Sequence, residues 1–128
     1  MELNDYQNKA MSTCMDSSRN MSYMAMGLVS EVGEFMGKIA KAIRKGDVHI
    51  GSEANESDLH YTIGFITDPD RCREWESDLK HELGDILWFA AGIADVMGWT
   101  LEEVAQENID KLDSRKERGV IDGNGDNR

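Results

Sequence analysis

Long stretches of this sequence repeat apolar residues every three or four positions, and a single proline, Pro69, interrupts the chain. That spacing gathers apolar side chains on one face of an α-helix. One stretch begins near Ser22 and stops at Gly46, and another runs from Asp68 and Pro69 to Gly98. Their apolar positions are Leu28, Val32, Phe35, Met36, Ile39 and Ile43, then Cys72, Trp75, Leu79, Leu83, Ile86, Ala90, Ile93 and Met97. The sequence therefore predicts two long amphipathic helices.

Two shorter helices are expected on either side of this pair. Asn4 followed by Gln7 is typical of a helix N-cap with a reciprocating side chain, and Thr100 followed by Glu103 forms a capping box. Gly119 is a natural C-terminal stop for the last helix. Four amphipathic helices and no clear sheet indicate an all-α, four-helix bundle-type domain, and one such domain is expected to span residues 1–128.

Two segments lack helical periodicity. Gly51, Ser52, Asn55 and Ser57 predict an irregular loop over residues 47–67, with a short strand or hairpin arm at residues 60–66 as the alternative. The glycine-rich residues 119–128 are expected to form either a free tail or a strap over bound phosphate. In the second case Arg128 would be a substrate-binding residue.

The charge of the chain restricts its partners. Fourteen Lys and Arg residues against twenty-five Asp and Glu residues give a net charge of −11, which repels nucleic-acid polymers and anionic membranes. A phosphate-bearing partner would therefore need bridging cations. Cys14 and Cys72 form no zinc-binding or disulfide pattern, and the start of the sequence does not read as a signal peptide, so a cytoplasmic protein is expected.

Two acidic pairs are the strongest candidates for chemistry. Glu31 and Glu34 are three residues apart on one predicted helix, and Glu82 and Asp85 are three apart on another, so each pair shares a helical face. If the helices are neighbours, four carboxylates converge, which is tolerable only with cations between them. Oxygen ligands suit Mg²⁺, with Mn²⁺ as a substitute. The competing interpretation is four solvated surface charges on a purely structural bundle.

The surroundings of the acidic pairs favour a functional interpretation. Strongly apolar residues flank both pairs, so we expect partly buried acids. Gly27, Gly33 and Gly84 lie inside the helices, where each costs about 1 kcal/mol relative to alanine. Close approach of a helix or a ligand would explain that cost.

Cationic side chains continue these polar faces. Lys38 and Lys41 follow Glu34 by one and two turns, and are candidates to bind substrate phosphates. Asn108, Lys111 and Arg115 form a second polar face at spacings of three and four on the last helix. Each of these residues is, alternatively, an ordinary solvated side chain.

The combined motifs resemble one family. They are residues 27–34 (Gly-Leu-Val-Ser-Glu-Val-Gly-Glu), 82–89 (Glu-Leu-Gly-Asp-Ile-Leu-Trp-Phe), 108–115 (Asn-Ile-Asp-Lys-Leu-Asp-Ser-Arg) and the ending at 118–126. In this order they are similar to the all-α nucleoside triphosphate pyrophosphohydrolases of the MazG type. One departure is Ser30, because many members have a glutamate there, and its absence leaves one carboxylate fewer for a second or third metal.

The resemblance implies a function. Members hydrolyse an NTP or dNTP to the monophosphate and pyrophosphate, so nucleotide-pool housecleaning is expected. It implies that Glu31, Glu34, Glu82 and Asp85 form the catalytic magnesium site. A glutamate released from the metal, such as Glu34, would accept the proton of the attacking water. Asn108, Lys111 and Arg115 would steady the metal shell or the phosphates, while Trp88 is a candidate for the base pocket.

Assembly and turnover leave two further expectations. Family members form dimers or tetramers with the nucleotide between subunits, so a homodimer or homotetramer is expected. The alternative to an enzyme is a helical module that binds metal or a partner without turnover, which the Ser30 departure favours.

Overall fold

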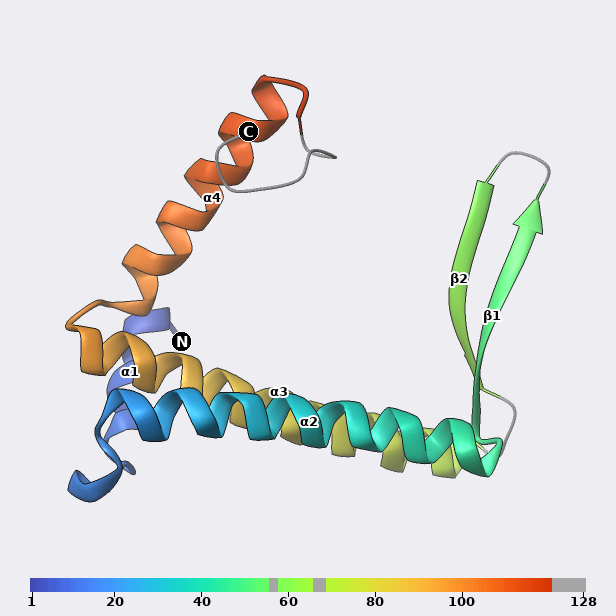
Figure 1. Ribbon diagram of the computed structural model, residues 1–128, viewed down its shortest axis with the longest axis horizontal. Helices are drawn as coiled ribbons and strands as arrows, with labels where there is room; N and C mark the ends of the chain where they lie inside the picture. Colours follow the sequence, from blue (N-terminus) through green and yellow to red (C-terminus); the bar gives the residue numbers. More distant parts are fainter. Residues whose placement is uncertain (56–57, 66–68, 121–128) are drawn as a thin grey trace. The chain divides into compact units, whose positions relative to one another are not determined.

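The computed structural model describes the backbone of residues 1–55, 58–65 and 69–120, and the side chains of residues 1–47 and 70–120. Figure 1 shows the elements in chain order, and their bounds are α1 (Leu3–Met11), the 3₁₀ turn η1 (Asp16–Ser18), α2 (Met21–Lys45), β1 (Val48–Asn55), β2 (Asp58–Phe65), α3 (Pro69–Met97) and α4 (Leu101–Glu117). The four predicted helices are all present, which confirms the all-α fold class. The chain divides into two compact units, the first of residues 1–24 and 90–128 and the second of residues 25–89.

The ends of the long helices follow the sequence signals. Asn20 precedes α2, and its side-chain Oδ1 accepts a hydrogen bond of 2.9 Å from the Tyr23 amide. Gly46 and Gly98, which come directly after α2 and α3, both adopt positive φ angles of 73° and 74°. Glycine adopts this backbone conformation at little cost, so both residues end their helices as expected.

An antiparallel hairpin takes the place of the expected irregular loop. β1 and β2 pair from Val48 with Phe65 to Asn55 with Asp58, so the prediction of an irregular loop is wrong over most of residues 47–67. The register pairs Ile50 with Ile63, two positions along from the first pair and so on the same face of the ladder. Apolar residues alternate visibly at the second strand, at Leu59, Tyr61, Ile63 and Phe65, and the alternative of a strand or hairpin arm at residues 60–66 is confirmed over residues 60–65.

In the first unit, side chains of α1 cap the start of α4. The amide groups of Leu101, Glu102 and Glu103 have no acceptor within the helix. They donate instead to Gln7 Oε1 at 2.8 Å, to Asn4 Oδ1 at 3.2 Å and to Thr100 Oγ1 at 3.1 Å. The Thr100–Glu103 capping box is confirmed, whereas the predicted N-cap role of Asn4 is wrong because Asn4 lies inside α1 and caps α4.

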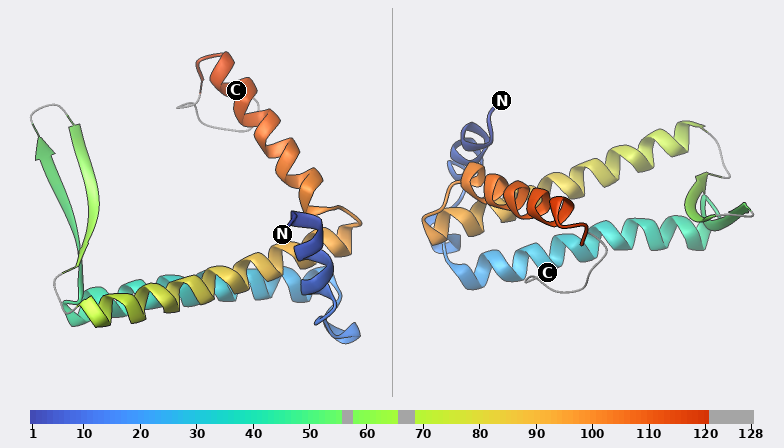
Figure 2. Two further views of the ribbon diagram at one scale, coloured as in Figure 1. Left: turned by 180° about the vertical axis from the view of Figure 1, so that it is seen from behind. Right: turned by 90° about the horizontal axis from the view of Figure 1, so that it is seen from above.

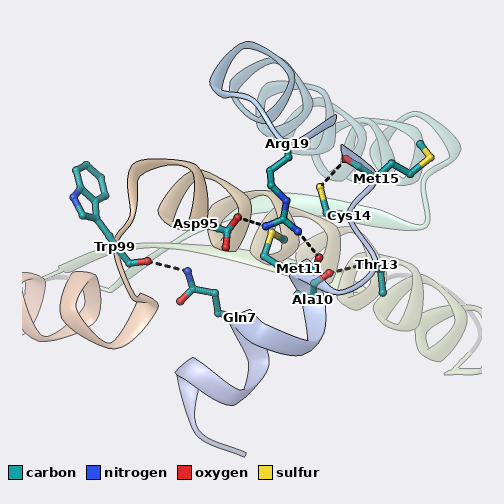
Figure 3. A network of polar contacts seen from close by, with 9 residues as sticks. All are labelled: Gln7, Ala10, Met11, Thr13, Cys14, Met15, Arg19, Asp95 and Trp99. Atoms are coloured by element: carbon teal, nitrogen blue, oxygen red, sulfur yellow. Dashed lines mark hydrogen bonds and ion pairs between the residues drawn. The ribbon is translucent and has the colours of Figure 1, made fainter. Parts of the chain in front are cut away.

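A small polar network closes the same unit, as Figure 3 shows. Arg19 pairs with Asp95 at 2.5 Å and also donates to the Met11 carbonyl at 3.0 Å. Gln7, only 7% exposed, donates to the Trp99 carbonyl at 2.9 Å. Beneath the network lies a compact apolar core formed by Ala10, Met11, Met24, Ala91, Ala94 and Leu101.

In the second unit, α2 and α3 run side by side in opposite directions (Figures 1 and 2). A Cβ placed on Gly27 would lie 2.0 Å from the Phe89 ring, so close helix approach explains this glycine. The same explanation fails at Gly33 and Gly84, where a Cβ would meet no described atom within 4 Å. The Phe89 ring therefore lies directly against α2 at Gly27.

Much of the apolar surface of this helix pair is uncovered. Phe89 and Ala42 are the buried apolar residues of the second unit among those the structure describes. In contrast, the exposed apolar side chains are Met26, Val29, Val32, Met36, Ile43, Leu83 and Leu87. Across the described residues, none of the helices has a stretch both long and apolar enough to cross a bilayer.

Candidate metal and phosphate site

Three of the four predicted carboxylates converge between α2 and α3. Glu31 and Glu34 from α2 and Glu82 from α3 each offer one oxygen, and these three oxygens all lie within 4.8 Å of one another. We call these three residues together with Asp85 the acidic cluster. Asp85 is not part of the three-oxygen group, but its charge acts on Glu31. The predicted meeting of two acidic pairs from separate stretches of the chain is thus present in the fold.

The members of the acidic cluster differ in exposure. Glu31 is half-buried, and the Glu82 side chain is 12% exposed, as expected for partly buried acids. Glu34 and Asp85 are instead exposed, so the expectation of burial is wrong for these two. Burial and the negative charges of the three neighbours raise the pKa of Glu31. Mutual repulsion of this kind is what a bound cation would relieve.

A continuous polar stripe extends from the acidic cluster along both helices. On α2 it continues with Lys38, Lys41 and Lys45, at alternating spacings of four and three residues from Glu34. On α3 the same spacings lead backwards from Glu82 to Asp78, Trp75 and Arg71. Because the helices are antiparallel and the spacings match, the two halves of the stripe stay opposite each other.

Lys38 joins the acidic cluster to the rest of the stripe. Its Nζ lies 3.1 Å from Asp78 Oδ2 and 3.4 Å from Glu82 Oε1. These two carboxylates raise the pKa of Lys38, which keeps it charged. The Trp75 indole N–H donates to the Lys38 carbonyl at 3.3 Å and so ties the helices together at this level. Lys38 is thus already paired within the chain.

The sequence prediction missed Asp78 and Trp75 as members of this arrangement. A signal was present, because Trp75, Asp78, Glu82 and Asp85 follow one another at spacings of three and four on one helical face. Trp75 was assigned only to the apolar side of its helix. Trp75 is half-buried, and its indole N–H donates the hydrogen bond to the Lys38 carbonyl.

A cavity of about 240 Å³ lies beside this part of the stripe. Its basic lining residues are Lys38, Lys41, Lys45 and Arg71, and its acidic ones are Asp47, Glu74 and Asp78. Arg71 pairs with Asp47 at 2.7 Å. With four basic and three acidic residues, the lining carries a slight positive charge in a chain whose net charge is −11. Lys41 and Lys45 bring positive charge to the cavity beyond the ion pairs of Lys38 and Arg71.

The remaining predicted residues lie elsewhere. Trp88 is half-buried, and its ring meets the Phe89 ring edge-on with centroids 4.9 Å apart. The residues Asn108, Lys111 and Arg115 are on α4, in the other compact unit, so their action on the acidic cluster stays a prediction. Arg128 lies outside the described residues.

Comparisons with known proteins agree with the resemblance seen in the sequence. Residues 19–120 match the pattern of the MazG nucleotide pyrophosphohydrolase domain. The chain is also 41% identical over 113 residues to the gene 37 protein of Mycobacterium phage L5, covering 88% of this chain and 81% of that relative. No solved structure matches the chain. Because the domain pattern covers α2, α3 and α4, including every carboxylate of the acidic cluster, the chain belongs to the MazG nucleotide pyrophosphohydrolase family.

Proposed function

We propose that this protein is a Mg²⁺-dependent nucleoside triphosphate pyrophosphohydrolase, which cleaves an NTP or dNTP to the monophosphate and pyrophosphate. The observation that carries the proposal is the convergence of the Glu31, Glu34 and Glu82 oxygens within 4.8 Å. Family membership supports the reaction class. Housecleaning of the nucleotide pool in the cytoplasm is part of the same proposal.

The residues of the acidic cluster fit a hard divalent cation. All four offer carboxylate oxygens, which Mg²⁺ and Mn²⁺ prefer over nitrogen or sulfur ligands. On one octahedral Mg²⁺ at least two of the three oxygen pairs would be adjacent, about 3 Å apart, so oxygens that lie within 4.8 Å of one another would close by up to about 2 Å to share one ion. The exposed positions of Glu34 and Asp85 leave the other coordination sites open to water and phosphate.

The half-buried and exposed carboxylates have different tasks in the proposed reaction. When bound, a divalent cation neutralises phosphate oxygens and makes a coordinated water more acidic. Glu31 and Glu82, the half-buried members, hold the site in place. Glu34 is exposed, and we assign its carboxylate as the acceptor of the proton from the attacking water. That water attacks the α-phosphorus, and pyrophosphate leaves.

The cavity supplies a place for the phosphates beyond the cleaved bond. Lys38 and Lys41 follow Glu34 by four and seven residues, about 6 and 10 Å along a helix axis. A triphosphate whose α-phosphate lies at the acidic cluster would extend its β- and γ-phosphates toward these ammonium groups. Asn108, Lys111, Arg115 and Arg128 remain proposed phosphate or metal contacts, and Trp88 a proposed base contact.

Assembly of more than one chain would complete the site. Val29 is 72% exposed and Met26 is 69% exposed, and both lie on the helix that carries Glu31 and Glu34. Exposed apolar side chains in this number are typical of a surface that another chain covers. We therefore propose a homodimer or homotetramer, which light scattering after size-exclusion chromatography would distinguish from a monomer.

A panel of triphosphates tests the proposed function. Purified protein is incubated with ordinary, deoxy and damaged nucleoside triphosphates and Mg²⁺, and the products are separated. The proposal predicts monophosphate and pyrophosphate from at least one of them, and none when EDTA replaces Mg²⁺. Diphosphate and inorganic phosphate would contradict the assigned bond. No product from any substrate would favour the alternative of a module that binds metal without turnover, for which Ser30 is the sequence argument.

A further inference from the structure

Lys38 contacts one carboxylate inside the acidic cluster and one outside it. Its Nζ is 3.4 Å from Glu82, one of the three residues whose oxygens converge. It is 3.1 Å from Asp78, which precedes Glu82 by one turn of α3. The Glu82 side chain is 12% exposed and that of Asp78 is 46% exposed. Lys38 thus has two partners: Glu82, which a bound metal would need as a ligand, and Asp78, which it would not.

We propose that Lys38 is the resident counter-ion of the acidic cluster, which releases Glu82 to a divalent cation while Asp78 retains the lysine. Lys38 is in this sense a positioning residue, because it acts through Glu82. The inference rests on the proposed metal site and describes its regulation. In the absence of a divalent cation, the ammonium group partly neutralises the crowded carboxylates; in its presence, the ammonium group is held back beside the cavity.

Electrostatics favours this exchange. A cation on Glu82 competes with a divalent ion for the same oxygen and repels it as well. A lysine with no second partner would lose its ion pair when the metal arrives, whereas Asp78 already lies within 3.1 Å. The Trp75 hydrogen bond to the Lys38 carbonyl fixes the backbone at this position. Only the end of the lysine side chain has to move.

The test is a titration of the purified full chain with Mn²⁺, followed by calorimetry and by the electron paramagnetic resonance of free Mn²⁺. Lys38→Met should tighten Mn²⁺ binding by about tenfold, as expected when a unit charge about 5 Å from a divalent ion is removed. Lys38→Arg keeps the charge and should bind Mn²⁺ like the wild type. Asp78→Asn leaves Lys38 on Glu82 and should weaken binding by about threefold.

A double variant separates this role of Asp78 from a general effect of its charge. If Asp78 acts through Lys38, Asp78→Asn should have no further effect in the Lys38→Met background. Glu74→Gln is the matched control, because Glu74 lines the same cavity one turn from Asp78, whereas the ion-pair partners of Lys38 are Asp78 and Glu82. Lys80→Met is the corresponding control for loss of an exposed lysine outside the polar stripe, on α3.

The outcomes separate this inference from the proposed function. Opposite shifts in the Mn²⁺ dissociation constant for Lys38→Met and Asp78→Asn, with unchanged controls, support it. Equal Mn²⁺ affinity in all variants, or weaker binding by Lys38→Met, overturns it while leaving the metal site intact. Absence of Mn²⁺ binding even by the wild type overturns the metal site itself, and this inference with it. Circular dichroism of each variant checks that the helices are retained, and Lys38→Gln, which also removes the charge, takes the place of Lys38→Met should that variant not fold.

Discussion

Replacing Gly27 with alanine changes how closely α2 and α3 can approach. A Cβ at this position would lie 2.0, 2.3 and 2.7 Å from three atoms of the Phe89 ring, and Phe89 is buried. Restoring an ordinary contact of about 3.5 Å requires the helices to separate locally by about 1.5 Å. Because the overlap is severe and Phe89 is buried, we expect a cost at the upper end of the range for overpacking, about 2–3 kcal/mol, of which the better helix propensity of alanine offsets about 1 kcal/mol. We expect a net loss of about 1–2 kcal/mol in the free energy of unfolding.

The separation should also reach the acidic cluster, because Glu31 lies one helical turn from Gly27. Urea unfolding of the metal-free protein measures the stability, and Mn²⁺ titration measures the effect on the cluster, which we expect to bind more weakly. Gly33→Ala is the control, since a Cβ there meets no described atom within 4 Å. It should gain up to about 1 kcal/mol from helix propensity. A Gly27→Ala variant as stable as the wild type, with unchanged Mn²⁺ affinity, would refute the reasoning.

Three further predictions concern other parts of the chain. The raised pKa of Glu31 means that its charged form is disfavoured in the folded state. Below the ordinary pKa of 4.5 the carboxyl is protonated in both states, and Glu31 does not lower the stability of the fold. As the pH rises from 4.5 through the raised pKa, the free energy of unfolding falls, and the full loss is present above the raised pKa. In EDTA, Glu31→Gln should therefore exceed the wild type in unfolding free energy at about pH 7 but not at about pH 4; a constant difference would contradict this. Gln7→Ala removes two hydrogen bonds of a buried side chain, to Trp99 and Leu101, and should cost about 2–3 kcal/mol in urea unfolding. Lys41→Met should raise the KM for the triphosphate more than it lowers kcat, and the reverse pattern in steady-state kinetics would remove Lys41 from the phosphate path.

Local signals in the sequence were sufficient for the helices and for the acidic pairs. Apolar spacing and the glycines at 46 and 98 determine the ends of α2 and α3 through short-range backbone effects, which a sequence displays directly. The convergence of Glu31 and Glu34 with Glu82 needed only the assumption that these two helices are neighbours. The charge repulsion of the four acids supplied a reason to expect a cation there.

Contacts that depend on how two helices or strands are aligned, or on a residue far away in the chain, could not be predicted from the sequence. The pairing of Lys38 with Asp78 depends on how α2 and α3 are aligned, and no local pattern reveals that alignment. Asn4 has the residue type of an N-cap, but it caps a helix almost one hundred residues away. In the hairpin, β2 shows alternating apolar residues in its sequence, whereas β1 shows no regular pattern after Ile50, so only the cross-strand pairing reveals that strand.

The most direct test of the proposed function compares the rate of pyrophosphate release by Glu82→Gln with that by the wild type. The matched control is Glu76→Gln, which removes the same charge from an exposed position of α3 outside the polar stripe. We predict that Glu82→Gln lowers Mg²⁺-dependent release by at least about a hundredfold while the helices stay folded, and that Glu76→Gln keeps wild-type activity. Full activity in Glu82→Gln would contradict the assignment of the acidic cluster as the catalytic metal site, and marked unfolding of that variant would identify Glu82 as a structural acid instead.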